Sequence, residues 1–138
     1  MAETKNKIGV LSCTGEDCLG GTISRLATRK LMEKVRPGET VTLCLPLFLA
    51  GGEEERTFAQ VHPTIALEGC DKCCAKKATE KYSAPVCDVL IVSDIIGKDV
   101  AESKALSTRY LTEEHNDMVD KVVDELVKKI DKIDSDRK

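Results

Sequence analysis

The sequence is very poor in aromatic residues. Only 3% of its 138 residues are aromatic and tryptophan is absent, yet 41% are hydrophobic. The core must therefore be built from Val, Ile, Leu and Ala. A chain of this length can bury enough aliphatic surface to fold without disulfides. We expect a single domain over residues 1–138, with an ordered core at 6–133 and a frayed tail at 134–138.

Long apolar runs are also missing. The first one, Ile8–Leu11, is far too short for a secretory or membrane-spanning segment. We therefore expect a cytoplasmic protein that does not associate with membranes. The net charge is −3 and no basic stretch is interleaved with aromatic residues, so nucleic-acid binding is not expected. A protein partner stays open, and no pattern indicates an oligomeric state.

Strand and helix patterns alternate along the chain. The predicted strands are Ile8–Cys13, Val41–Leu45, Thr64–Leu67 and Val86–Ser93, and the predicted helices are Leu19–Val35, Glu53–Gln60, Asp71–Tyr82 and Leu111–Ile133. This order predicts an α/β fold: one three-layer domain with a mainly parallel four-stranded sheet, Rossmann-like or flavodoxin-like. The last strand is almost continuously apolar, which indicates burial on both faces.

Seven cysteines are present, an odd number that rules out complete pairing within the chain. In a reducing compartment, clustered cysteines more often bind metal or carry out redox chemistry than form structural disulfides. Six of them follow predicted strands and so fall at the carboxyl edge of the sheet, where sites form in such folds: Cys13, Cys18, Cys44, Cys70, Cys73 and Cys74. Cys87 begins a strand at the opposite edge and is predicted to be a small buried core residue.

The densest group is the segment EGCDKCC. Cys70 and Cys74 share a face if the segment is helical, and Cys70 and Cys73 form a C-x-x-C pair. Either spacing could place two sulfurs on one metal ion, each about 2.3 Å from zinc. Cys13 and Cys44, at the ends of neighbouring strands, are the natural donors to complete a tetrahedral site.

Charge around these cysteines is also informative. Cys13, Cys18 and the Cys70–Cys74 group lie at predicted helix N-termini, where the helix dipole is expected to lower thiol pKa values. Four thiolates on a divalent cation leave a negative site. Nearby lysines could partly offset it: Lys72, Lys76, Lys77 and Lys98.

Several segments together resemble a known family. The segments are GVLSCTG, the cysteine in TLCLPLFLAGG, EGCDKCCAKKATEKY and SDIIGKD. They resemble the zinc-binding DGC-domain proteins, whose motif is Asp-Gly-Cys followed by Cys-Ala. Here the motif reads Glu68-Gly69-Cys70 and Cys74-Ala75. The resemblance implies a zinc ion held by Cys13, Cys44, Cys70 and Cys74, with Cys18 and Cys73 as additional possible ligands.

Two other functions use the same cysteines. One is a thiol redox or sulfur-transfer enzyme, in which adjacent thiols form a disulfide relay or carry a persulfide. The other is an iron–sulfur protein, since sulfur-only ligand sets suit both zinc and iron–sulfur clusters. Whether the protein is an enzyme stays open: four protein ligands would close a zinc site, whereas an open fourth position would permit catalysis.

A phosphatase function is not supported. CTGEDC resembles the catalytic loop of low-molecular-weight phosphatases, in which an arginine that clamps the oxyanion follows the nucleophilic cysteine. Counted from Cys13, that position is occupied by Leu19. Without the guanidinium, the loop lacks its main anion clamp.

His62 and His115 have no partners at metal-ligand spacing, and Asp94 is predicted to end a strand on the cysteine edge.

Overall fold

The computed structural model describes residues 6–13, 15, 17–104 and 106–137. Its sheet has four parallel strands: β1 (Ile8–Ser12), β2 (Thr40–Val41), β3 (Thr64–Glu68) and β4 (Asp88–Ile91). Their order is β2-β1-β3-β4. This order is that of the first four strands of a flavodoxin-like sheet. The predicted α/β class with a parallel four-stranded sheet is confirmed.

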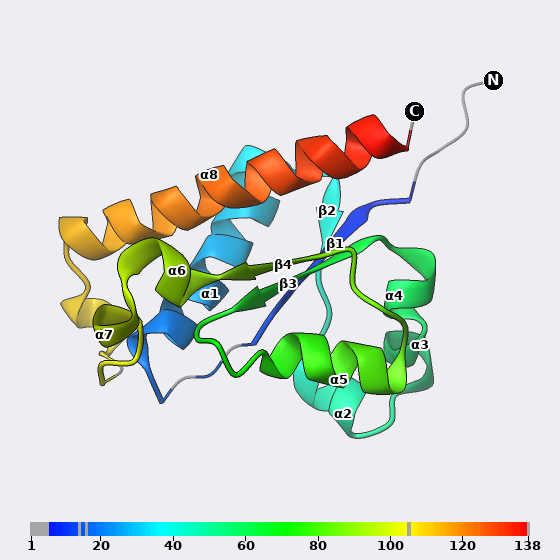
Figure 1. Ribbon diagram of the computed structural model, residues 1–138, viewed down its shortest axis with the longest axis horizontal. Helices are drawn as coiled ribbons and strands as arrows, with labels where there is room; N and C mark the ends of the chain where they lie inside the picture. Colours follow the sequence, from blue (N-terminus) through cyan, green and yellow to red (C-terminus); the bar gives the residue numbers. More distant parts are fainter. Residues whose placement is uncertain (1–5, 14, 16, 105, 138) are drawn as a thin grey trace.

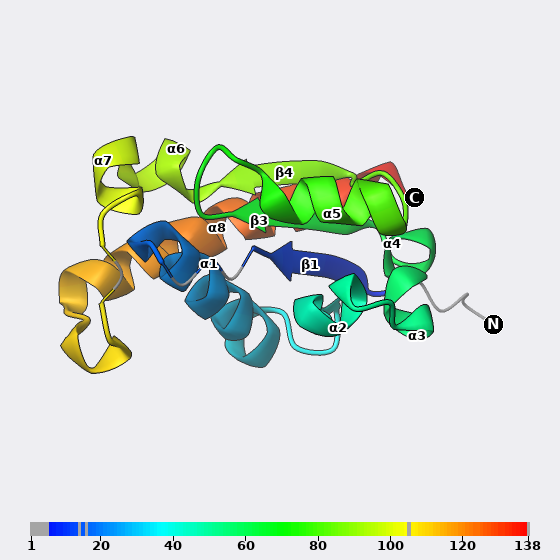
Figure 2. The ribbon, with the colours of Figure 1, turned by 90° about the horizontal axis from the view of Figure 1, so that it is seen from below.

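Helices cover both faces of the sheet (Figures 1 and 2). One face carries α1 (Leu19–Lys30), continued by the π-helix η1 (Leu31–Val35), and the long α8 (Glu113–Asp136). On the other face lie α2 (Leu45–Leu49) and α5 (Cys74–Tyr82), with α3 (Glu53–Arg56) and α4 (Phe58–Val61) beside them. After β4 come α6 (Val92–Ile96), α7 (Lys98–Ala101) and the short 3-10 helix η2 (Thr108–Tyr110).

The two cores follow from the alternation of side chains along the strands. Val10 of β1 and Ile65 and Leu67 of β3 point toward α1 and α8, whereas Leu11 and Ala66 point toward α5. The α1–α8 side holds the larger core, to which both helices contribute apolar residues at three- and four-residue spacing: Leu19, Ile23, Ala27, Val119, Val122, Val123, Leu126 and Ile130. The α5 side holds a smaller cluster, which includes Cys13.

Helix α8 begins at a capping box. The backbone N–H of Thr112 donates to His115 Nδ1 over 2.9 Å, and the Thr112 side chain caps the helix in return. His115 therefore has a structural role. The helix ends at Asp136, so it continues beyond residue 133, where the sequence indicated a frayed tail. No helix in the described ranges combines the length and apolarity that a membrane span requires.

Several predicted boundaries were wrong. Strand β2 ends at Val41 and not at Leu45, because Pro46 lies in the first turn of α2, where its fixed φ favours a helix start. The predicted helix 53–60 is divided into α3 and α4, and the predicted helix 71–82 begins only at Cys74. These shifts matter most for the cysteines.

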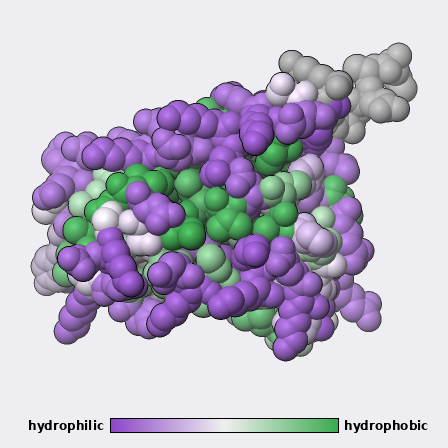
Figure 3. Space-filling model, in the orientation of Figure 1, coloured by the Kyte–Doolittle hydropathy of each residue, from purple (hydrophilic) through white to green (hydrophobic). Residues whose placement is uncertain are grey.

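The predicted burial of strand β4 also differs from the structure. It is an edge strand, and only Leu90 of its four residues is buried, so the predicted burial on both faces is wrong. Figure 3 shows the consequence: an apolar band crosses this face of the molecule below the polar surface of α8. Partly buried side chains of β4 and α6 pack against the two cores: Val89 against the smaller one, and Ile95 and Ile96 against the larger one.

Candidate functional site

The candidate site lies where β1 and β3 end side by side. Cys13 follows β1, and its backbone N–H donates to the carbonyl of Leu67 over 2.9 Å. The Cys13 sulfur accepts the backbone N–H of Gly69 over 3.2 Å and lies 3.7 Å from the hydroxyl oxygen of Ser24. The residue after β1 is thus fixed to the chain that leaves β3.

Three glycines allow helix α1 to press against this loop. A Cβ on Gly69 would lie 2.5 Å from the backbone nitrogen of Gly21, and a Cβ on Gly20 would lie 2.4 Å from the carbonyl oxygen of Gly69. These neighbours are backbone atoms and cannot rotate away. The absence of side chains at these positions therefore brings the start of α1 onto the loop that carries Cys70.

The turn after β3 places its three cysteines in different environments. Cys70 lies in the loop, Cys73 is the N-cap of α5, and Cys74 is the first residue of α5. Cys70 is therefore not on the helix, so the condition under which Cys70 and Cys74 would share a helical face is not met. Cys73 has φ 55° and ψ 48°, the only left-handed non-glycine residue among those described. Such a conformation is uncommon for a cysteine and indicates that surrounding contacts impose it.

A buried carboxylate organises this turn. Glu68, the last residue of β3, is only 1% exposed. Its Oε1 accepts the backbone N–H of Ala75 over 3.0 Å, and its Oε2 accepts that of Lys76 over 2.8 Å. Two of the unpaired N–H groups at the start of α5 are thereby satisfied by a side chain from a strand. Burial raises the pKa of Glu68, and the two backbone hydrogen bonds and the nearby lysines oppose that shift.

Burial and charge both raise the pKa of two thiols in this turn, Cys73 and Cys74. Burial raises the pKa of Cys74, and the negative charges of Glu68, Cys13 and Cys70 raise it further. Burial and Glu68 likewise raise the pKa of Cys73. The predicted lowering by the dipole of α5 is therefore wrong for these two thiols, because burial, the larger cause, and the charge of Glu68 both raise their pKa values. Lys77 acts in the expected direction and lowers both pKa values.

The remaining cysteines at this edge are less closely associated. Cys44 is exposed and forms the N-cap of α2, between Leu43 and Leu45, which both pack against the cluster that contains Cys13. Cys18 is half-buried at the N-cap of α1 and forms an antiparallel bridge with Lys104. No disulfide joins any of the seven cysteines, all of which fall in the described ranges.

Two further sequence-based predictions were wrong. Cys87 is exposed and not a core residue, because the strand begins one residue later, at Asp88, and lies at the edge of the sheet. Asp94 is exposed on α6 and lines a groove with residues of α8, including Lys121 and Val127. His62 contacts the carbonyl of Lys7 through Nδ1 over 2.8 Å and takes no part in the cysteine site.

The thiols do not form a ready-made metal centre. Within the described ranges, no three His, Cys, Asp or Glu side chains come close enough together to hold one metal ion. The donor set nevertheless fits a thiophilic metal. Cys13 and Cys70 lie near enough to Cys74 for their charges to act on it, and all three are sulfur donors.

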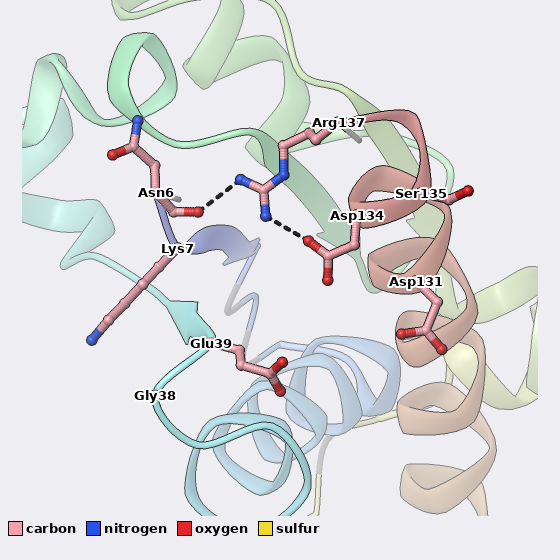
Figure 4. Close-up of a pocket in the computed structure, with 8 residues that line it drawn as sticks. All are labelled: Asn6, Lys7, Gly38, Glu39, Asp131, Asp134, Ser135 and Arg137. Carbon is pink, nitrogen blue, oxygen red and sulfur yellow. Dashed lines mark hydrogen bonds and ion pairs between the residues drawn. The ribbon is translucent and has the colours of Figure 1, made fainter. Parts of the chain in front are cut away.

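A charged cavity of about 520 Å³ lies at the opposite edge of the sheet (Figure 4). It is lined by residues that precede β1 and β2 and by the last turn of α8, and none is a cysteine. Arg137 crosses it, donating to the carbonyl of Asn6 over 2.8 Å and to the carboxylate of Asp134. Asp134 pairs with Arg137, whereas Glu39 and Asp131 pair with Arg36, and the cavity is separate from the thiols.

Fold and site together define an α/β protein with cysteines gathered at the carboxyl edge of a parallel sheet. Comparison with family models agrees with this description, since the model of the DGC domain matches residues 9–126. The chain therefore belongs to the DGC domain family. No curated protein and no solved structure matches it significantly.

Two contributors to the site were missed in the sequence. In the sequence, Glu68 stands only in the place of the aspartate of the family motif. Its burial and its hydrogen bonds depend on the position of α5, which the sequence does not reveal. Gly69 was noted as part of the same motif, but its contact with α1 depends on the packing of two distant segments. The only sequence signal for either residue was its position beside Cys70.

Proposed function

We propose that this protein binds one zinc ion at the carboxyl edge of its sheet, through Cys13, Cys70 and Cys74, with Cys44 as the fourth ligand. The observation that carries the proposal is that the sulfur of Cys13 lies against Gly69, at the start of the turn that carries Cys70 and Cys74, beside the buried carboxylate of Glu68. Zinc suits this donor set because thiolates are its preferred structural ligands.

The electrostatics of the turn support the binding of a cation. Cys13, Cys70, Cys74 and Glu68 repel one another when ionised, which is why the pKa of Cys74 is raised by the other three as well as by burial. A divalent cation removes this repulsion and displaces the thiol protons. The surroundings thus favour a metal-thiolate site over three free thiolates.

The raised pKa values of Cys73 and Cys74 disfavour these two thiols as the reactive residues of a redox or sulfur-transfer enzyme. Reactive cysteines require a lowered pKa and an electropositive environment. The pKa values of Cys73 and Cys74 shift in the opposite direction. An iron–sulfur cluster would use the same ligands, and the colour of the protein distinguishes it from zinc.

Cys44 has a particular place in this proposal. Its side chain is exposed, whereas the neighbouring Leu43 and Leu45 pack inward against the cluster that contains Cys13. Its recruitment therefore requires the first turn of the five-residue α2 to adjust. A site with four thiolates is closed and supplies stability, whereas one that lacks the fourth leaves a position for an exchangeable ligand.

The proposal is tested by purifying the full chain without oxygen, measuring zinc and iron per chain, and recording the visible spectrum. We expect a colourless protein with one zinc ion. Serine substitution at Cys13, Cys70 or Cys74 should abolish stoichiometric zinc, and Cys44→Ser should weaken it. Cys87→Ser is the matched control, because Cys87 is exposed and lies beyond the other edge of the sheet. A metal-free or brown protein contradicts the proposal, as does loss of zinc from the control.

A further inference from the structure

We propose that Glu68 is a positioning residue, whose carboxylate ties the start of α5 to the end of β3 and so holds the cysteine turn in place for metal binding. This inference rests on the proposed function for its metal readout. It also makes a prediction for the metal-free protein that does not depend on metal.

Helix α5 lacks a cap of the usual kind. The N-cap of this nine-residue helix is Cys73, whose side chain makes no capping hydrogen bond. A cysteine is a poor cap compared with Ser, Thr, Asp or Asn. The carboxylate of Glu68 replaces the missing cap and binds the N–H groups of Ala75 and Lys76. Cys73 and Cys74 can therefore occupy the first positions of the helix without leaving these two donors unpaired.

The carboxylate reaches the helix from the neighbouring strand. Glu68 is at the end of β3, in register with Ile91 of β4, and points to the face on which α5 lies. Its side chain thus spans directly from strand to helix, whereas the backbone takes five residues, 69–73, to cover the same path. Both ends of the cysteine turn are fixed by this one side chain.

The turn is also linked to the thiol that follows β1. The residue after Glu68, Gly69, donates its N–H to the sulfur of Cys13 over 3.2 Å. Adjacent residues of one strand end therefore hold both parts of the site: Gly69 contacts Cys13, and Glu68 fixes the helix that begins with Cys74. Loss of the Glu68 hydrogen bonds should loosen Cys74 relative to Cys13.

The burial of a carboxylate is otherwise hard to explain. A charged group that is 1% exposed is costly unless it is well hydrogen-bonded. The N-terminus of α5 stabilises a negative charge through its dipole and its free N–H groups. Glu68 thus lies at the one place in this turn from which its carboxylate can accept the free N–H groups at the start of α5.

The test compares Glu68→Gln with Glu80→Gln in the full chain. Glu80 is on the same helix and pairs with the side chain of Lys76 at 3.7 Å. Its substitution therefore removes the same charge but leaves in place the hydrogen bonds that Glu68 accepts from the backbone of Ala75 and Lys76. In Glu68→Gln one carboxylate oxygen becomes an amide nitrogen that cannot accept a hydrogen bond. In the metal-free protein, hydrogen exchange of at least one of the Ala75 and Lys76 amides should therefore accelerate at least about tenfold in Glu68→Gln only, while amides of α8 report that the fold is intact. Unchanged exchange at both amides overturns the inference.

The second readout is cobalt(II) binding, followed by its thiolate charge-transfer and ligand-field bands. Glu68→Gln should lower cobalt affinity about 10- to 100-fold and change the bands, whereas Glu80→Gln should match the wild type. If the wild type binds cobalt and Glu68→Gln binds it equally well, the inference fails and the proposed function stands. If the wild type binds no metal, the proposed function fails, and hydrogen exchange alone decides the role of Glu68.

A second variant covers the case in which Glu68→Gln does not fold. Glu68→Asp keeps the charge but shortens the side chain by one methylene, so it should release at least one of the two amides. Native protection of both Ala75 and Lys76 in this variant also contradicts the inference.

Discussion

Replacement of Gly69 by alanine should damage both the stability of the protein and its metal site. The new Cβ would lie 2.5 Å from the backbone nitrogen of Gly21 and 2.7 Å from the carbonyl carbon of Gly20. Because these atoms belong to the backbone of α1, the start of that helix or the loop after β3 must move. Overpacking of this kind costs about 1–3 kcal/mol. For a chain of this size, the melting temperature should fall by about 4–12 °C.

The same movement should weaken metal binding. The N–H of Gly69 is the donor to the sulfur of Cys13, and Cys70 is its neighbour in the chain. A displaced Gly69 therefore carries Cys70 away from Cys13. Thermal unfolding followed by circular dichroism measures the stability, and competition titration with a zinc chelator measures the affinity.

Gly38→Ala is the matched control. Gly38 has φ +79°, and no heavy atom lies within 4 Å of the position that a Cβ would take there, so alanine meets backbone strain but no collision. Strain of this kind costs about 1–2 kcal/mol, at the opposite edge of the sheet. The control should melt earlier than wild type and still bind zinc normally. Equal loss of affinity in both variants would show that binding follows stability alone, and wild-type behaviour of Gly69→Ala would refute the packing argument.

Three further predictions concern the thiol of Cys74, the hydrophobic core and the cap of α8. Burial and the charges of Glu68, Cys13 and Cys70 raise the pKa of Cys74 above its ordinary value of 9.0. The pH midpoint of Cys74 alkylation in the metal-free protein, measured by peptide mass spectrometry, should therefore lie above 9.0. A lower midpoint would count against the electrostatic argument. Leu126→Ala should lower the free energy of unfolding, measured in urea, by about 2–5 kcal/mol because Leu126 is fully buried. Val61→Ala, at a side chain 46% exposed, should lower it by less than about 0.5 kcal/mol. Similar losses in both variants would contradict the assigned core. Thr112→Ala should cost about 1 kcal/mol by removing the cap of α8, and an unchanged urea midpoint would exclude that role.

Much of the fold was predictable because its signals are local. Apolar alternation and helical spacing identified β1, β3, α1 and α8, whose side chains form the larger core. The order of the strands had no such signal, since it depends on how the helices cross the sheet. The apolar residues of β4 therefore suggested a strand buried on both faces, although β4 lies at the edge of the sheet and is only partly buried.

The candidate site was predictable only in part, for a similar reason. Strand ends placed Cys13 and Cys70 at the same edge, and the structure agrees. The predicted pKa shift failed for Cys73 and Cys74 because it considered only the dipole of α5 and neither the burial of these thiols nor the carboxylate at the start of the helix. Glu68 reaches that position through tertiary packing, which neither composition nor spacing reveals.

X-ray absorption at the zinc edge of the anaerobically purified chain tests the central claim most directly. The account predicts a first coordination shell dominated by sulfur at about 2.3 Å, and a reduced sulfur count in Cys74→Ser. A first shell made only of nitrogen or oxygen at about 2.0–2.2 Å, or the absence of zinc from the protein, would contradict metal binding by these cysteines.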